Sequence, residues 1–154
     1  MKRPIKYSLP VLLILLFVAP QAFADCTVTT TPVGFGNYDT AATTPLDTTG
    51  SIAISCDKTQ GPPPTVTISI SVSSNSGVFI PRQMKHFSRP DVLNYNLYTK
   101  QNRTTVWGDG TGGTSVVLVP GTQNRKVTIY ATVPPQQNVR AGLYSDMLTV
   151  TITW

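Results

Sequence analysis

The sequence predicts a single all-β domain behind an export signal. Only 12% of the 154 residues are charged and all seven acidic residues are Asp, which argues against charged helices and coiled coils. Ser and Thr supply 33 of the last 130 residues, where they alternate with Val, Ile, Leu and Tyr at the period of two that half-buried strands require. Turn-forming stretches separate these alternating segments, a spacing typical of a β-sandwich.

Residues 1–24 are predicted to be a secretory signal peptide. Three basic residues precede an apolar run at 9–19, and Ala22 and Ala24 place small side chains where signal peptidase acts. The run is too short for a transmembrane helix, which needs about twenty apolar residues. Cleavage after Ala24 would leave one domain, 25–154, with nine basic and seven acidic residues, exported to the periplasm and then to the cell surface.

Five segments show the clearest alternation of apolar and polar residues, and each places its apolar set on one face. The expected strands are 52–56, 66–72, 93–97, 127–133 and 147–154. Their apolar sets are, in chain order, Ile52, Ile54 and Cys56; Val66, Ile68, Ile70 and Val72; Leu93, Tyr95 and Leu97; Val127, Ile129, Ala131 and Val133; and Leu148, Val150, Ile152 and Trp154. Turns are expected at 47–50, 60–64, 73–77, 108–113, 120–124 and 134–138.

The two cysteines, Cys26 and Cys56, are predicted to form a disulfide, because paired cysteines are the rule in exported chains with an even count. The alternative is two free buried thiols. Together with the single histidine, His86, they are too few for a zinc site, and no other metal or cofactor is expected.

Composition and motifs argue against nucleic-acid binding and against catalysis. The basic residues of the mature part are scattered, which leaves no footprint for nucleic acid. Residues 108–113 match the nucleotide-binding pattern G-x-G-x-x-G by letter, but 114–119 alternates like a strand, so we expect a loop. His86 is expected to be a solvated surface residue, whereas a secreted hydrolase would need it in a pocket beside an Asp. Residues 78–81 are expected to form a core or edge strand, and the alternative is an exposed apolar loop or short strand that could bind surfaces.

The chain resembles the spore coat protein U-like domains, a family that includes subunits of archaic chaperone-usher pili. The resemblance spans nearly all of the mature part. Each matching motif is weak by itself, but the motifs in this order are specific for the family. They are Cys26 near the start, VGFGNY at 33–38, PLD at 45–47 leading into GSIAISC at 50–56, RQM at 82–84, LNYNLY at 93–98, WGDG at 107–110, GLYSD at 142–146 and VTITW at 150–154.

The resemblance implies an immunoglobulin-like β-sandwich that lacks its last strand. A periplasmic pilus chaperone would first fill the resulting groove, and the donor strand of a neighbouring pilus subunit would replace the chaperone at the outer-membrane usher. The segment 147–154 runs to the end of the sequence, so we expect its edge to be open. The expected groove residues are Val28, Leu148, Val150, Ile152 and Trp154.

The function implied is a structural or adhesive pilus subunit without enzymatic activity, which supports surface attachment or biofilm formation. Family members that donate a strand carry a long extension before their first cysteine, whereas only Asp25 would precede Cys26 here. We therefore expect a subunit that accepts a strand but donates none, and that sits at the tip of the fibre. The alternative is a secreted spore coat or extracellular matrix protein with a self-sufficient sandwich.

Overall fold

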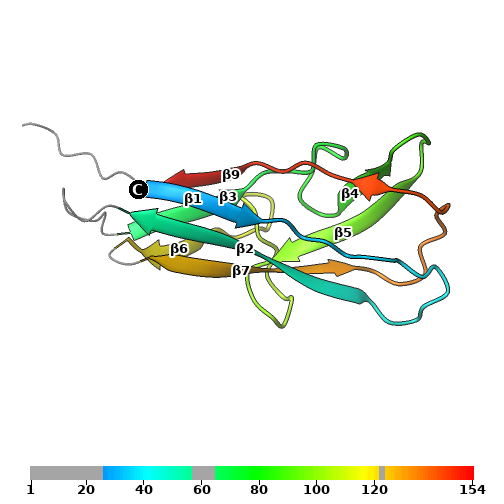
Figure 1. Ribbon diagram of the computed structural model, residues 1–154, viewed down its shortest axis with the longest axis horizontal. Helices are drawn as coiled ribbons and strands as arrows, with labels where there is room; N and C mark the ends of the chain where they lie inside the picture. The colour runs from blue at the N-terminus through cyan, green and yellow to red at the C-terminus, as the bar shows by residue number, and fades with distance from the viewer. Residues whose placement is uncertain (1–25, 57–64, 122–123) are drawn as a thin grey trace, which may run out of the picture.

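The computed structural model describes residues 26–56, 65–121 and 124–154, and these ranges contain strands and loops but no helix (Figure 1). The strands are β1 (Cys26–Thr31), β2 (Leu46–Cys56), β3 (Thr65–Ile70), β4 (Arg82–His86), β5 (Val92–Tyr98), β6 (Val117–Pro120), β7 (Arg125–Val133), β8 (Tyr144–Ser145) and β9 (Val150–Thr153). The prediction of an all-β fold is confirmed. In the described part of the chain, no helix has the length and apolar character to cross a membrane. The predicted signal peptide, 1–24, lies outside the described residues.

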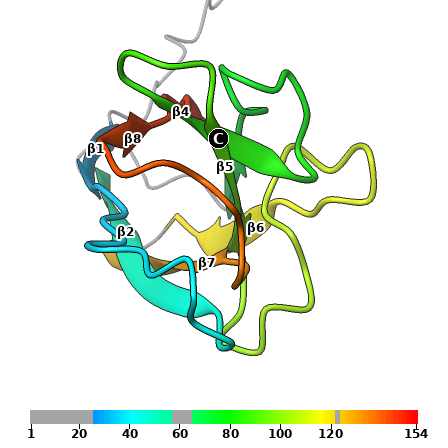
Figure 2. The ribbon, with the colours of Figure 1, turned by 90° about the vertical axis from the view of Figure 1, so that its right-hand side faces the viewer.

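The strands form two antiparallel sheets. One has the order β1-β2-β7-β5-β4-β8 and the other the order β6-β3-β9. Seen along the long axis of the molecule, the larger sheet curls, so that its two edge strands β1 and β8 fall on the same side (Figure 2). The curl places the edge of the small sheet beside β1 as well.

Alternation along the central strands builds the core between the sheets. Ile52 and Ile54 of β2 belong to the same apolar cluster as Ile68 and Ile70 of β3. The buried members are Ile52, Ile54, Cys56, Val66, Ile68, Ile70, Leu93, Tyr95, Leu97, Trp107, Ile129, Ala131 and Val133. Trp107 comes from a loop, and its indole N–H donates to the Ile68 carbonyl at 3.1 Å, so the largest core side chain keeps its polar atom satisfied.

Arg82 is a charged residue inside this core, with no exposed surface. Its guanidinium donates to the carbonyl of Ser71 from both Nε and Nη2, to the Trp107 carbonyl at 2.8 Å and to the Asn96 side-chain oxygen at 3.0 Å. The ring of Phe79 covers it at 5.4 Å. Because Arg82 lies on β4 and Ser71 follows β3, this side chain connects the two sheets.

Three predicted boundaries are wrong, for local reasons. The predicted strand 66–72 ends at Ile70, the last residue of β3. Residues 47–50 belong to β2 rather than to a turn, because they pair with 129–132 of β7 in a continuous ladder. The predicted strand 147–154 shrinks to β9 (Val150–Thr153). The amides of Met147 and Thr149 bond to side-chain oxygens of Asp146 and Ser71 instead of to a neighbouring strand.

The remaining predictions concern the turns, the segment 78–81 and His86, and only some of them are confirmed. The stretches 73–77, 108–113 and 134–138 are outside strands, as expected, while 60–64 and part of 120–124 lie outside the described residues. Residues 78–81 form an exposed loop, so the expected core or edge strand is wrong. His86 is buried in β4, so its expected place on the surface is also wrong.

We expect Arg82→Met to lower the free energy of unfolding by about 3–5 kcal/mol, because buried acceptors in both sheets would lose their donor. Urea unfolding of the mature protein measures the change. Arg125→Met is the matched control, since Arg125 is exposed at the start of β7 and should change stability by less than about 0.5 kcal/mol. Equal effects of the two substitutions would contradict the role given to Arg82.

Candidate functional site

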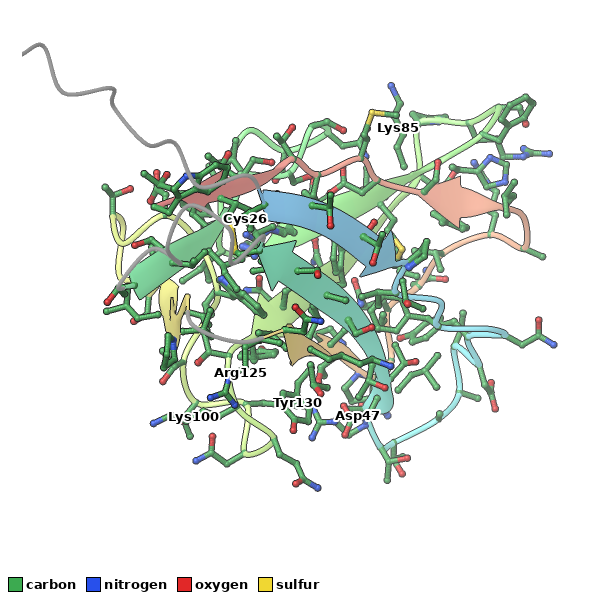
Figure 3. All side chains as sticks on the ribbon, turned by 60° about the vertical axis from the view of Figure 1, so that its left-hand side comes forward. Cys26, Asp47, Lys85, Lys100, Arg125 and Tyr130 are labelled. Carbon is green, nitrogen blue, oxygen red and sulfur yellow. A yellow bond between two sulfur atoms is a disulfide. The ribbon has the colours of Figure 1, made fainter. Side chains whose placement is uncertain are left out.

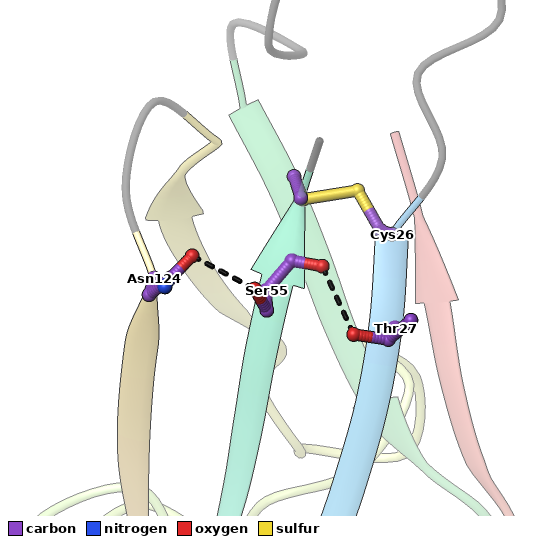
Figure 4. The surroundings of a disulfide bond; sticks show 5 residues. Cys26, Thr27, Ser55 and Asn124 are labelled. Atoms are coloured by element: carbon purple, nitrogen blue, oxygen red, sulfur yellow. Dashed lines mark hydrogen bonds between the residues drawn. A yellow bond between two sulfur atoms is a disulfide. The ribbon is translucent and has the colours of Figure 1, made fainter. Parts of the chain in front are cut away.

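Two sheet edges lie side by side without being joined. β1 is the edge of the larger sheet and pairs only with β2, and β9 is the edge of the smaller sheet and pairs only with β3. The two strands run next to each other in Figures 1 and 4. Within the described residues no backbone hydrogen bond connects them. The unpaired N–H and C=O groups of both strands can therefore bind another strand.

The core-facing side chains along this seam are incompletely covered. Val28 pairs with Ile54, which is buried, yet Val28 is 38% exposed. Val150 and Ile152 likewise pair with the buried Ile70 and Ile68 but are only half-buried themselves. Residues on one face of a sheet share their surroundings, so this contrast locates missing cover between β1 and β9.

A groove of about 410 Å³ occupies the seam. Its apolar lining comes from both sheets and from the segment after β1: Val33, Phe35, Ile70, Met84, Tyr95, Leu97, Ile129, Leu148 and Val150. Thr30 and Thr31 border it on the β1 side, and the segment 144–148 borders it on the other. A second cavity of about 750 Å³ shares Val33, Phe35, Met84 and Tyr144 with the groove and continues toward the β4–β8 end.

Asp146 fixes the wall that leads into β9. Its carboxylate accepts hydrogen bonds from the backbone and hydroxyl of Ser74, from the Asn75 amide, from the Tyr95 hydroxyl at 2.7 Å and from the Met147 backbone. Burial, reinforced by the bond to Asp146, raises the pKa of Tyr95 far above its ordinary value, so the hydroxyl stays a donor. The wall is thus attached to a core residue and to the 73–77 turn.

Ser71 attaches the next part of the same wall. Its backbone N–H donates to the Thr149 carbonyl at 2.9 Å, and its hydroxyl accepts from the Thr149 N–H at 3.0 Å. The Ser71 carbonyl in turn binds Arg82. The start of β9 is therefore linked to the buried guanidinium through a single residue.

The opposite wall depends on a glycine and a disulfide. A Cβ at Gly50 would lie 2.8 Å from both the Thr31 carbonyl oxygen and the Val33 side chain, so only glycine lets Val33 turn into the groove. Cys26 and Cys56 form the predicted disulfide, which joins the first residue of β1 to the last of β2 (Figure 4). Beside it, Thr27 donates to the Ser55 carbonyl and Ser55 to Asn124.

The predicted groove residues are divided by the structure. Leu148 and Val150 line the groove. Val28 and Ile152 lie on the core-facing side of the two edge strands but outside the lined part, and Trp154 follows β9 half exposed. Sequence reasoning missed Met147, which lines the groove and is 79% exposed, and the floor residues Phe35 and Met84. Alternation finds core-facing residues such as Tyr95 and Leu97, but it does not reveal which of them a groove leaves open.

His86 does not form part of a catalytic set. Its Nδ1 accepts from the Ser88 N–H at 3.1 Å and its Nε2 lies 3.3 Å from the Ala141 carbonyl oxygen. The ring packs edge-on against Tyr144. Both nitrogens are therefore engaged by backbone groups, and in the part of the chain that the structure describes no Asp side chain bonds to them. The structure therefore does not support the secreted-hydrolase alternative, which needs His86 in a pocket beside an Asp.

The Spore Coat Protein U domain family matches residues 13–151. The chain is 31% identical over 128 residues to Protein U of Myxococcus xanthus, covering 79% of this chain and 71% of that protein. The resemblance found in the sequence is thereby confirmed. The description of the family is that of a structural protein domain, in agreement with the expectation that this chain is not an enzyme.

Two solved structures match the chain, and the first is similar to it in fold. One is a chain of the CsuC–CsuE chaperone–tip adhesion subunit pre-assembly complex from archaic chaperone-usher Csu pili of Acinetobacter baumannii, with a TM-score of 0.58 and 19% identity. The match covers 86% of this chain but 40% of that chain, so this chain spans less than half of its length. The other is the E. coli Hda pilus minor tip subunit HdaB, with a TM-score of 0.44 and 12% identity over 82% of this chain and 79% of that chain.

We expect Asp146→Ala to loosen the groove wall, because Ser74, Asn75 and Tyr95 would lose their common acceptor. Amide hydrogen exchange over 144–149 should become faster, and the free energy of unfolding should fall by about 1–3 kcal/mol. Asp109→Ala is the control, since that carboxylate bonds only within its own turn, to Thr111. Unchanged exchange over 144–149 would show that the wall does not depend on Asp146.

Proposed function

This chain belongs to the Spore Coat Protein U domain family, and on that premise we propose that it is a structural or adhesive subunit of a chaperone-usher pilus. It works by donor-strand complementation, in which a β-strand from another protein chain completes an immunoglobulin-like sandwich. The observation that carries this proposal is the groove between the free edges of β1 and β9, over an apolar floor.

An inserted strand would be bound in two ways. Its backbone would pair with β1 on one side and β9 on the other, which supplies affinity without regard to sequence. Its alternate side chains would point into the groove, against Leu97, Ile129 and Leu148, and would cover Met147 and Val28. The donor is therefore expected to carry apolar residues at every second position.

The partners follow from this mode of assembly. A periplasmic pilus chaperone fills the groove after export, and the donor strand of a neighbouring subunit replaces the chaperone at the outer-membrane usher. The fold similarity to a chain from a chaperone–subunit pre-assembly complex supports a chaperone as one partner. The protein then lies on the cell surface as part of a fibre.

A finer proposal is that the subunit accepts a strand but donates none. From Cys26 onward the chain is engaged in its own fold, because Cys26 is bonded to Cys56 and begins β1. A donor segment would have to precede Cys26, and the predicted cleavage after Ala24 would leave Asp25 alone there. Such a subunit ends a fibre at its tip, where it supports surface attachment or biofilm formation.

The identity with Protein U and the family description favour a second candidate function. In that case the chain is a secreted spore coat or extracellular matrix protein. The two candidates differ in whether the folded protein needs a strand from another chain.

We expect Val150→Arg to abolish capture of a chaperone from periplasmic extract, because the charge would point into the apolar groove. Thr151→Arg is the matched control, since Thr151 is the neighbouring β9 residue, is exposed and points the other way. An antibody against the untagged protein recovers the complexes, which are analysed before and after heating in detergent. A free wild-type monomer that unfolds reversibly would favour the coat or matrix function instead.

We expect a donor extension fused ahead of Cys26 to allow incorporation inside the fibre, whereas the natural chain is found only at the end. Immunogold labelling of isolated fibres shows the position. Mass spectrometry of the mature protein tests the premise, since a start at Asp25 is predicted. If the fused protein folds normally and still labels only fibre ends, the missing extension does not explain the tip position.

A further inference from the structure

Two of the most exposed large apolar side chains lie next to each other at one end of the molecule. Phe87 is 86% exposed and Leu143 is 72% exposed. The Phe87 N–H donates to the Leu143 carbonyl at 2.9 Å, so the two residues belong to adjacent backbone segments. They lie at the end formed by the β4–β5 loop and the segment before β8, which faces the viewer in Figure 2.

The backbone beneath this pair is well fixed. His86 pairs with Tyr144 in the β4–β8 ladder, and their rings pack edge-on with centroids 5.0 Å apart. Gly142 passes so close to the His86 ring that no side chain fits there. Phe87 and Leu143 are thus held outward by ordered neighbours, and presenting them to a partner requires little loss of conformational freedom.

Three basic residues are close to the apolar pair along the chain. Lys85 precedes Phe87 by two residues on the outward side of β4, Arg89 follows it, and Arg140 precedes Leu143. Two acids lie nearby in the described part of the chain: Asp91 is largely covered and bonds to Arg140 at 3.1 Å, and the exposed Asp39 lines the second cavity together with Arg140 and Leu143. Lys100 and Arg125 lie away from Lys85, at the opposite edge of the view in Figure 3. We call the group Lys85, Phe87, Arg89, Arg140 and Leu143 the basic pole.

We propose that the basic pole binds the surface of a lipid bilayer that carries anionic headgroups. Protruding apolar side chains beside basic ones are suited to the membrane–water interface. There the apolar side chains enter the acyl region of the bilayer, and the basic side chains stay among the lipid headgroups. The inference goes beyond pilus assembly and does not depend on it, because the pole lies outside the β1–β9 seam. Arg140 and Leu143 also border the second cavity, whereas Phe87 does not.

The test is co-sedimentation of the mature, exported protein with lipid vesicles. One set contains equal amounts of phosphatidylcholine and phosphatidylglycerol, and the other contains phosphatidylcholine alone. We expect binding to the anionic vesicles that weakens with added salt. Phe87→Ser should weaken it by about tenfold or more, and the double substitution Lys85→Gln with Arg89→Gln should weaken it and reduce the salt dependence.

Two control variants remove exposed apolar side chains elsewhere. Leu118→Ser changes a 63% exposed residue of β6, and Met147→Ser changes the exposed residue of the groove. Both should leave vesicle binding unchanged, and thermal unfolding verifies that every variant is folded. Equal binding to the two kinds of vesicle, an equal loss in Leu118→Ser or Met147→Ser, or no binding at all would overturn the proposal. If the protein binds neither kind of vesicle, a protein partner would be the better explanation of the basic pole.

Discussion

Arg82 brings a guanidinium into the core where the two sheets meet, and the way its charge is satisfied holds the layers together. A buried charge is costly unless every donor finds an acceptor. The acceptors come from the end of β3, from β5 and from the Trp107 loop, so these segments must approach one point. Burial lowers the pKa of Arg82, yet arginine starts so high that it remains charged. The sheets are thus joined by direction-specific bonds as well as by apolar contact.

The shape of the groove depends on the same centre. Ser71 binds Arg82 through its carbonyl and Thr149 through its amide and hydroxyl, and Asp146 binds the segment just before it to Tyr95. None of these contacts involves an inserted strand. The wall is therefore held by contacts within the chain itself, and a strand that enters the groove would bind against a surface that these contacts shape. Such preorganisation reduces the entropic cost of binding.

The sequence was sufficient where one physical pattern acts alone. Period-two alternation located the buried strands β3, β5 and β7, and export with two cysteines predicted the disulfide. Sequence patterns were insufficient where pairing between strands determines the structure. β1 is rich in threonine and β4 in polar residues, and each becomes a strand by pairing with neighbours: β1 with β2, and β4 with β5 and β8. Residues such as Asp146 and Met84 enter the site through folding geometry, which leaves no local signal.

The exposed apolar side chains divide into groups with different origins. Val28, Met147 and Trp154 lie along the β1–β9 seam, and a strand inserted there, as proposed, would cover part of their exposed surface. Phe87 and Leu143 stand at the end of the molecule beyond that seam, and they would stay exposed after the groove is filled. Side chains that stay exposed when the groove is filled do not take part in binding the inserted strand. Supported by His86 and Tyr144 and close to basic residues, this apolar pair fits the proposed contact with an anionic membrane better than a role in strand exchange.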